Sequence, residues 1–378
     1  MEHSGPLKGT RIIDLATGVP GAYTAMLLGD MGADVVRVEF AGRTADSERP
    51  DFRLWNRGKR SVTVDAASEA GLEVVRRLAA HSDVLVTPSQ GLPAALTYDA
   101  LKAVNERLVY CLITPYGDGG PLDAAPADDG TVSAFAGMYG DQGGWQEPPV
   151  YVLLPITSYA TAFVASLGIS AALHAREKTG RGQRVEVPMM AACLAMQTGS
   201  IVSGPRVRTW ARDARGQQGI NPVYRLYKAS DRWLFIACGN VVFWNKLCLA
   251  FDRIDWLEDP RFEGAPWNIP VEHRDALTAM MADIVKTRTR AEWLTYLSEN
   301  DIPCAPVLSR EEFVKHPQVV HNAILAETAD PVLGPMRAMT VPVKFYGTPG
   351  APGGPAHAPG QDTASVLAEL GLGGKERR

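Results

Sequence analysis

The stretch TRIIDLATGVPGAYTAMLLGDMGADVVRVE, residues 10–39, places two strand patterns on either side of a helix pattern. The apolar residues Ile12, Ile13 and Leu15 predict a buried strand, and a loop with glycine and proline follows it. Residues 22–31 are helical in composition and are followed by Gly32, a residue that commonly ends helices. A second, valine-rich strand follows at 35–38. A strand–helix–strand unit of this kind predicts an α/β fold with a parallel sheet.

The same alternation recurs outward from this stretch. Residues 69–81 are helical in composition, with Ser68 placed to cap their start, and the apolar strand SDVLV follows at 82–86. A long alanine-rich helix over 158–176 precedes the strand RVEV at 184–187. These segments are expected to add strands and helices to the same sheet.

The length of 378 residues exceeds what one compact core usually holds. Residues 223–238, VYRLYKASDRWLFIAC, alternate in places around a Ser-Asp turn, which predicts an antiparallel hairpin. Thr289 and Glu292 have the spacing of a capping box at a helix start. The predicted parts are a large domain over 1–221, a small domain over 222–325 and a C-terminal segment over 326–378.

Composition narrows the possible functions. The chain is 46% hydrophobic and 21% charged, with a formal net charge of −4, which gives no reason to expect nucleic acid or a membrane surface as a partner. The five cysteines are scattered without a CxxC pair, so free thiols in a reducing cytoplasm are expected rather than disulfides. The sequence has no HExxH, P-loop or GxSxG motif, and no metal site is predicted.

One cluster of basic residues could bind phosphate. NRGKRS, residues 56–61, gathers Arg57, Lys59 and Arg60 around a glycine. Basic side chains beside a flexible backbone suit phosphate oxygens. The alternative is a solvated turn between two elements, and composition alone favours the turn.

Two further places could carry chemistry. Asp128 and Asp129 are adjacent carboxylates, and like charges side by side could raise one pKa and create a general acid or base. The alternative is a cap, with Asp129 capping a helix that starts at Gly130. Ser158, in PITSYATAF, has an equally plain interpretation as the cap of the long helix.

Several separate segments, in the same order, resemble the family III CoA-transferases, the group that also contains α-methylacyl-CoA racemases and carnitine and bile-acid CoA-transferases. The similarity extends over nearly the whole chain. Besides residues 6–39, the matching segments are NRGKRSVTVD (56–65), ITPYGDGGP (113–121), AALHAREKTGRGQRVEV (171–187), EWLTYLSENDIPCAPV (292–307) and GQDTASVLAELG (360–371).

This resemblance implies a fold and a ligand. Family members have a Rossmann-like large domain built from both chain ends, a smaller inserted α+β domain, and two chains interlocked as a dimer. They bind coenzyme A or acyl-CoA as a substrate on the large domain and hold no covalently bound cofactor. The residues that the resemblance assigns to CoA here are Gly18, Gly21, Arg57, Lys59 and Arg60.

The resemblance also locates the position of the family nucleophile. Family transferases use an aspartate whose carboxylate attacks the thioester and then carries CoA as an enzyme thioester. Counting back without a gap from the segment that starts at Ala171 places Ser158 at that position. The racemase His-Asp pair is matched by Asp128 and Asp129. Phe40 stands where the family often has an arginine, and Pro88-Ser89 replace its common Asn-Phe.

Three functions are compatible with these departures. The chain could be the non-nucleophilic subunit of a heteromeric CoA-transferase, paired with a related chain that carries the aspartate. It could instead be a homodimeric acyl-CoA enzyme for hydrolysis, elimination or isomerisation, with Asp128 or Asp129 as acid–base group and Ser158 as hydrogen-bond donor. It could also bind acyl-CoA without catalysis.

Overall fold

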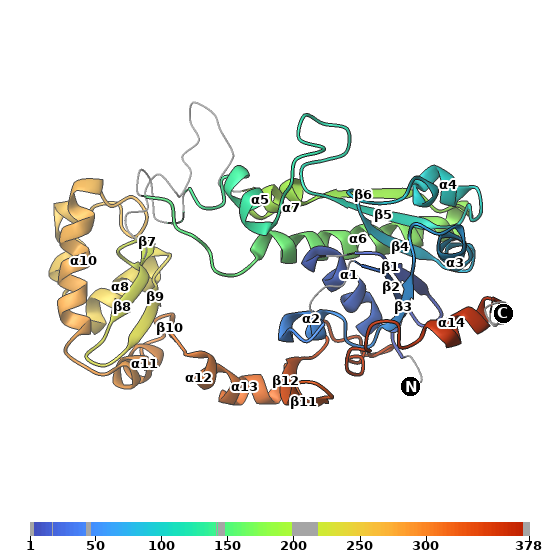
Figure 1. Ribbon diagram of the computed structural model, residues 1–378. Coiled ribbons are helices and arrows are strands. Elements are labelled where there is room, and N and C mark those ends of the chain that lie inside the picture. Colours follow the sequence, from blue (N-terminus) through green and yellow to red (C-terminus); the bar gives the residue numbers. More distant parts are fainter. Residues whose placement is uncertain are drawn as a thin grey trace. The chain divides into compact units, whose positions relative to one another are not determined.

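The computed structural model describes residues 4–16, 18–42, 47–140, 142, 148–198 and 218–372 (Figure 1). The chain divides into two compact units, which are described separately below. Unit 1 comprises Met1–Ala136, Leu154–Met196 and His316–Arg378, and unit 2 comprises Gly137–Leu153 and Gln197–Lys315. The division of the chain at residues 222 and 325 stays a prediction.

Unit 1 is built on a six-stranded sheet in the order β3-β2-β1-β4-β5-β6, with every neighbouring pair parallel. The predicted parallel α/β fold is therefore confirmed. The strand order reverses between β1 and β4, and at such a reversal a crevice opens beyond the carboxyl ends of the strands. The strands are β1 (Arg11–Asp14), β2 (Asp34–Phe40), β3 (Arg60–Val64), β4 (Val84–Pro88), β5 (Val109–Thr114) and β6 (Arg184–Pro188).

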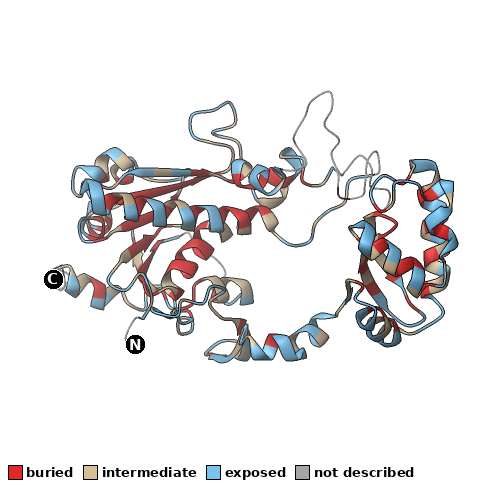
Figure 2. Cartoon of the chain, turned by 180° about the vertical axis from the view of Figure 1, so that it is seen from behind, coloured by how far each residue is buried: buried red, intermediate tan, exposed pale blue. Residues whose placement is uncertain are grey.

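Helices cover both faces of this sheet because its strands are apolar on both sides (Figure 2). Ile12 belongs to the core under α1 and α6, whereas its neighbour Ile13 belongs to the core under α3, α4 and α14. Successive side chains of a strand point to opposite faces, so one short strand serves both cores. The helices of unit 1 are α1 (Val19–Asp30), α2 (Pro50–Trp55), α3 (Glu69–Ala80), α4 (Tyr98–Lys102), α5 (Asp129–Phe135), α6 (Ile156–Thr179), α7 (Met189–Met196), α13 (Pro317–His321) and α14 (Thr363–Glu369).

Helix α6 is the longest helix among the described residues and the central one of its layer. By length and composition alone it could cross a membrane. Ala165 and Ile169 on its inner face are buried in the same core as Ile12. Arg176 near its end is buried and donates to Asp83 Oδ1 at 2.9 Å. We therefore assign α6 to the core of an α/β unit.

The C-terminal part of the chain returns to the edge of the sheet. The backbone amide of Ser61 on β3 donates to Asp362 Oδ2 at 2.7 Å, and the amide of Asp362 donates to the carbonyl of Ser61 at 2.8 Å. Val366 of α14 is fully buried in the core that contains Ile13. Before this return, the chain forms an antiparallel hairpin of β11 (Leu325–Asp330) and β12 (Gly334–Met339), which the sequence did not predict.

Unit 2 holds a four-stranded sheet in the order β10-β9-β8-β7, with all pairs antiparallel. The predicted hairpin is confirmed as β8 and β9, and the capping box is present, with the amide of Thr289 donating to Glu292 Oε2 at 2.8 Å. Trp244, Trp256 and Trp293 are buried in its core. Its elements are β7 (Gly219–Asn221), β8 (Tyr224–Lys228), β9 (Trp233–Ala237), α8 (Val241–Ala250), α9 (Asp255–Glu258), α10 (Val271–Val285), α11 (Arg290–Glu299), β10 (Cys304–Pro306) and α12 (Arg310–Lys315).

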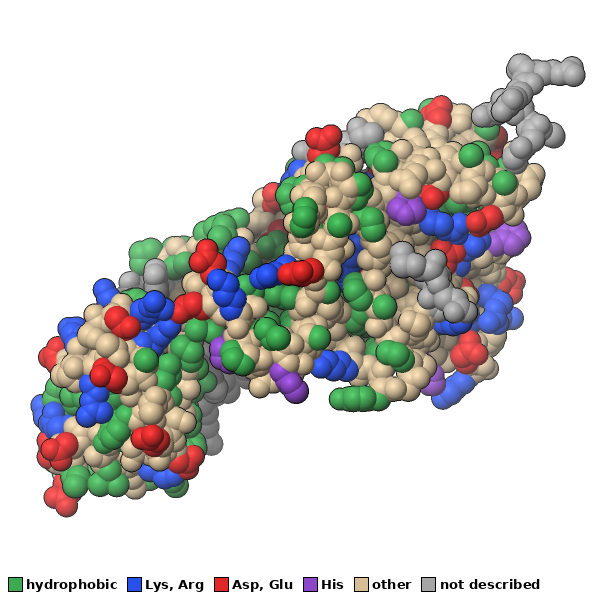
Figure 3. Space-filling view, turned by 90° about the horizontal axis from the view of Figure 1, so that it is seen from below, with side chains coloured by type: hydrophobic (Ala, Val, Ile, Leu, Met, Phe, Trp, Pro, Cys, Tyr) green, Lys and Arg blue, Asp and Glu red, His purple; other side chains and the backbone are tan. Residues whose placement is uncertain are grey.

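Charged side chains of both signs are interspersed on the surface. Figure 3 shows blue and red side chains side by side on one face, without a large area of a single sign. Many of them are paired, as in the partly exposed bridge of Arg60 to Asp34 at 2.7 Å and to Glu369 at 2.6 Å. This distribution agrees with the small net charge of −4.

Gly21 is expected to be required for packing. A Cβ atom at this position would lie 2.2 Å from Cβ of Ala16, a distance that real atoms do not reach. Gly21→Ala should therefore lower the free energy of unfolding by about 1–3 kcal/mol, because α1 would have to move away from the end of β1. Gly18→Ala is the matched control, since its Cβ would meet only Pro20 Cδ at 3.7 Å. Urea denaturation of both variants measures the difference, and equal stabilities would contradict the packing role.

Candidate functional site

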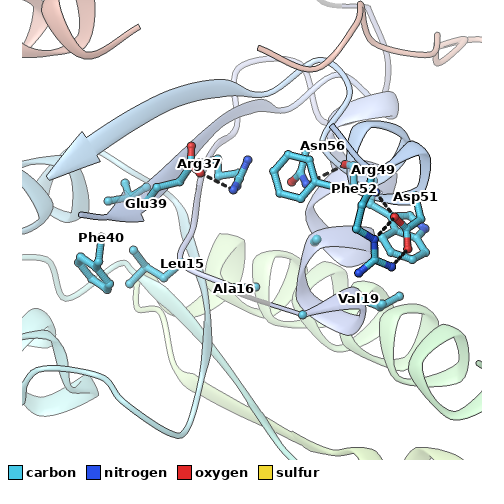
Figure 4. A pocket seen from close by; sticks show the side chains of 14 residues that line it. Leu15, Ala16, Val19, Arg37, Glu39, Phe40, Arg49, Asp51, Phe52 and Asn56 are labelled. Carbon is cyan, nitrogen blue, oxygen red and sulfur yellow. Dashed lines mark hydrogen bonds and ion pairs between the residues drawn. The ribbon is translucent and has the colours of Figure 1, made fainter. Parts of the chain in front are cut away.

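A pocket lies at the carboxyl ends of β1 and β2, against the start of α1 and against α2 (Figure 4). We name it the β2–α2 pocket. Its position follows from the sheet, since the chain leaves each parallel strand at this edge before entering the next helix. The residues that line it are Leu15, Ala16, Gly18, Val19, Ala22, Arg37, Val38, Glu39, Phe40, Arg49, Asp51, Phe52, Trp55 and Asn56.

The charges that line this pocket are balanced. Arg37 is buried, donates to Glu39 Oε1 at 2.6 Å and lies over the ring of Phe52 at 4.3 Å. Arg49 Nε donates to Asp51 Oδ1 at 3.1 Å. Each of the two arginines in the lining thus has a carboxylate partner. The pocket combines an aromatic wall with paired charges and suits a flat ring more than a bare anion.

The three basic residues predicted to bind phosphate are committed to internal ion pairs. Arg57 is buried and pairs with the carboxylate of Asp30. Lys59 is 2% exposed and donates to Asp14 Oδ2 at 2.7 Å. Arg60 is partly exposed and forms the surface bridges described above. None of the three lines the β2–α2 pocket. Their assignment to CoA phosphates stays a prediction, as does that of Gly21, while Gly18 does line the pocket.

Ser158 is the third residue of α6 and is 2% exposed. The expectation that it caps the helix is wrong, because Pro155 occupies the cap position. The backbone amide of Ser158, in the first turn of the helix, instead donates to Asp129 Oδ2 at 2.6 Å. Asp129 therefore supplies from α5 the acceptor that a proline cannot provide.

Asp128 and Asp129 lie at the start of α5, but the residue that caps this helix is not the one predicted. Asp128, not Asp129, caps α5: its Oδ1 accepts from the amide of Thr131 at 2.8 Å, and its own amide donates to Thr131 Oγ1 at 2.8 Å. Asp129 is the first residue of the helix, so the expectation that it caps from before Gly130 is wrong. The hydrogen bonds from Thr131 hold the pKa of Asp128 below its usual value, so Asp128 is ionised near neutral pH.

Tyr159 connects the surroundings of Ser158 with the β2–α2 pocket. Its ring meets the edge of Tyr23 on α1, with ring centroids 5.5 Å apart. Burial raises the pKa of Tyr159, and the negative charges of Asp129 and Asp51 raise it further. Asp51 lines the pocket, and Asp129 binds the amide of Ser158. The phenol thus lies within electrostatic range of both places and stays protonated near neutral pH.

Helices α1 and α6 bring these features together. Each connects two parallel strands, so each starts at the carboxyl edge of the sheet. They pack against each other, and Thr24 Oγ1 donates to the carbonyl of Ala162 at 3.5 Å. Tyr159 could not be predicted from the sequence, because its partners Tyr23 and Asp51 are distant in the chain. The one local signal is the spacing of Tyr159 and Phe163 by one helical turn.

Metal and thiol chemistry find no support in the part of the chain that the structure describes. No group of three or more His, Cys, Asp or Glu side chains there is arranged to hold a metal ion. The five cysteines are free, and burial raises the pKa of Cys111 to about 12.

Comparison with known proteins identifies the family. The model of CoA-transferase family III matches residues 7–363. A succinyl-CoA:glutarate CoA-transferase of Mus musculus is 28% identical over 382 residues, covering 97% of this chain and 86% of that protein. A formyl-CoA:oxalate CoA-transferase of Escherichia coli O157:H7 is 26% identical over 419 residues, covering 99% of this chain and 97% of that protein.

Two solved structures share the fold over nearly their full length. The hypothetical protein Rv3272 of Mycobacterium tuberculosis superposes with a TM-score of 0.83 at 25% identity, covering 97% of this chain and 100% of that chain. A CAIB/BAIF family protein of Brucella suis gives a TM-score of 0.82 at 26% identity, with coverage of 97% and 100%. Since the family model spans almost the whole sequence and these folds agree, the chain belongs to CoA-transferase family III.

Proposed function

We propose that this chain binds acyl-CoA and serves as the non-nucleophilic subunit of a heteromeric CoA-transferase. The observation that carries the proposal is the state of Ser158. Its side chain is buried, and among the described residues its hydroxyl forms no hydrogen bond to a base. A serine hydroxyl is a weak nucleophile unless an adjacent base accepts its proton.

The chemistry of CoA transfer needs a carboxylate. A carboxylate attacks the thioester carbonyl and gives a mixed anhydride, while the CoA thiolate leaves; the thiolate then attacks the anhydride at the enzyme carbonyl and releases the acyl group as a free acid. A serine could form only an ester and could not carry CoA as a thioester. A partner chain of the same family, with an aspartate at the position of Ser158, would supply that group in a heterodimer.

The β2–α2 pocket supports the binding part of this proposal. Its aromatic lining suits the adenine ring, and it lies at the same edge of the sheet as the start of α6. A nucleotide bound there could extend its thioester toward Ser158. The relatives named above act on CoA thioesters, according to their names, and a CoA thioester is the ligand proposed here.

The homodimeric acid–base function has less support. Acid–base chemistry by a homodimer needs Asp128 or Asp129 as a proton carrier, but both carboxylates accept hydrogen bonds from helix amides. Binding without catalysis, in contrast, agrees with the geometry as well as the subunit role does. The two differ only in whether a partner chain restores transfer.

The test uses the purified full chain. Calorimetric titration with CoA should give saturable binding, and transfer of CoA between an acyl-CoA and isotopically labelled acid should be absent. Adding a family III chain that carries the aspartate should give a mixed dimer by native mass spectrometry and should start the transfer. Transfer by the chain alone would overturn the subunit role, and a failure to bind CoA would overturn the whole proposal.

A further inference from the structure

We infer that the acyl group taken by this chain is uncharged and apolar, and that an aromatic patch beside Ser158 receives it. The inference rests on the proposed binding of acyl-CoA and adds the substrate class. The aromatic patch consists of Tyr23, Trp55, Tyr159 and Phe163.

The patch begins directly after Ser158. Tyr159 and Phe163 are four residues apart on α6 and therefore lie on one face of the helix, one turn apart. Both meet the ring of Tyr23 edge-on, with centroids at 5.5 Å and 5.8 Å. Tyr23 is buried, while 51% of Phe163 is exposed. The patch thus has a fixed base and an accessible end.

The patch is continuous with the β2–α2 pocket. Trp55 lines that pocket and also packs against the cluster of Tyr23, Met26 and Leu27. Tyr159 packs against the same cluster. A ligand with its nucleotide in the pocket therefore has a continuous aromatic surface along which the acyl chain can lie. Contact with such rings favours apolar groups by removing their surface from water.

The charges around the patch exclude an anionic acyl group. The carboxylates of Asp129 and Asp51 both raise the pKa of Tyr159, and Asp51 is itself paired with Arg49. Among the described residues Asp129 has no ion-pair partner, because its contacts are the amide of Ser158 and the hydroxyl of Ser133 at 3.4 Å. The cation that acts on Tyr23 is Arg57, which is buried in its pair with Asp30. A second carboxylate on an acyl group held against Tyr159 would therefore meet the carboxylate of Asp129, for which the described residues supply no counter-charge.

The experiment compares ligands that differ only in the acyl group. Calorimetric titrations with hexanoyl-CoA, phenylacetyl-CoA, succinyl-CoA and CoA should give at least tenfold tighter binding of the two neutral thioesters than of succinyl-CoA. Equal or tighter binding of succinyl-CoA would overturn the inference. Because CoA is titrated in parallel, a chain that binds none of the four would reject the proposed function instead.

Single-residue variants then test whether Phe163 and Asp129 cause the preference for neutral acyl groups. Phe163→Ala should weaken hexanoyl-CoA about fivefold and leave CoA unchanged, whereas Leu167→Ala, which changes an exposed residue one turn further along α6, should affect neither. Asp129→Asn keeps an oxygen acceptor for the amide of Ser158 and should strengthen succinyl-CoA about fivefold. Sedimentation of each variant serves as the second measurement. If Phe163→Ala changed the oligomeric state and not the acyl preference, the patch would be an interface between chains, and the inference would be wrong.

Discussion

Ser158→Asp is expected to give the chain a covalent carrier that the unchanged protein lacks. After incubation with acyl-CoA, intact-mass spectrometry should show a CoA adduct on the variant and none on the original chain. The physical reason is the position: residue 158 is in the first turn of α6, where the positive end of the helix dipole stabilises a carboxylate. The new carboxylate would also stand where the resemblance to the family predicts the nucleophile.

The control for this experiment is Ser158→Asn, which has the same shape without a nucleophilic carboxylate. It should bind CoA and form no adduct. The adduct on the aspartate variant should disappear with hydroxylamine, because hydroxylamine cleaves thioesters and anhydrides. If the aspartate variant bound CoA but formed no adduct, more than the nucleophile would be missing from this site. A CoA adduct on the unchanged chain would contradict the proposed subunit role.

Lys59→Met is expected to cause the largest loss of stability of any single change considered. Lys59 is 2% exposed, and its ammonium donates to Asp14 Oδ2 at 2.7 Å, to the carbonyl of Ala22 at 2.8 Å and to Asn56 Oδ1 at 2.9 Å. The substitution would leave the carboxylate of Asp14, which has no solvent exposure, without its counter-charge. Breaking a buried pair from one side costs about 3–5 kcal/mol. Guanidinium denaturation measures this loss.

Two further variants separate the buried charge from general disruption. The double change Lys59→Met with Asp14→Leu removes both charges and should recover part of the loss, since apolar replacements of a buried pair are often neutral. Arg60→Met removes a partly exposed pair on the next residue and should cost about 0–1 kcal/mol. A double variant less stable than Lys59→Met would show that the hydrogen bonds, and not the unpaired charge, decide the stability.

The sheet of unit 1 could be predicted because its strands are short, apolar and separated by helical patterns. The hairpin of β8 and β9 was predictable for a similar reason, since its turn at Ser230-Asp231 interrupts two alternating runs. The hairpin of β11 and β12 was not predicted. Its segments LAETAD and GPMRAM are exposed or half-buried except at Asp330 and Ala338 and lack a continuous apolar face, so no periodicity distinguishes them from loop.

The candidate site shows a different limit. Counting along the chain predicts Ser158 as the position of the family nucleophile, but its environment depends on contacts that the sequence does not reveal. Asp129 is 29 residues away from the amide that it binds, and the local pattern around it indicated only a helix start. Lys59 looked like a surface residue by composition, yet it is buried because Asp14 at the end of β1 compensates its charge. Pairings between distant polar residues follow from the finished fold and leave no local signature.

The docking of the C-terminal segment on β3 has a consequence for synthesis of the protein. Strands β1 to β6 are complete once residue 188 has been made, but the core beneath α3 still lacks Val366, and β3 still lacks the partners at Gly360 and Asp362. Until residues 360–366 have been made, a nascent chain therefore lacks these contacts along the edge strand β3 and part of the core beneath α3. During that interval the exposed strand edge is a place where a chaperone can bind or where two unfinished chains can aggregate.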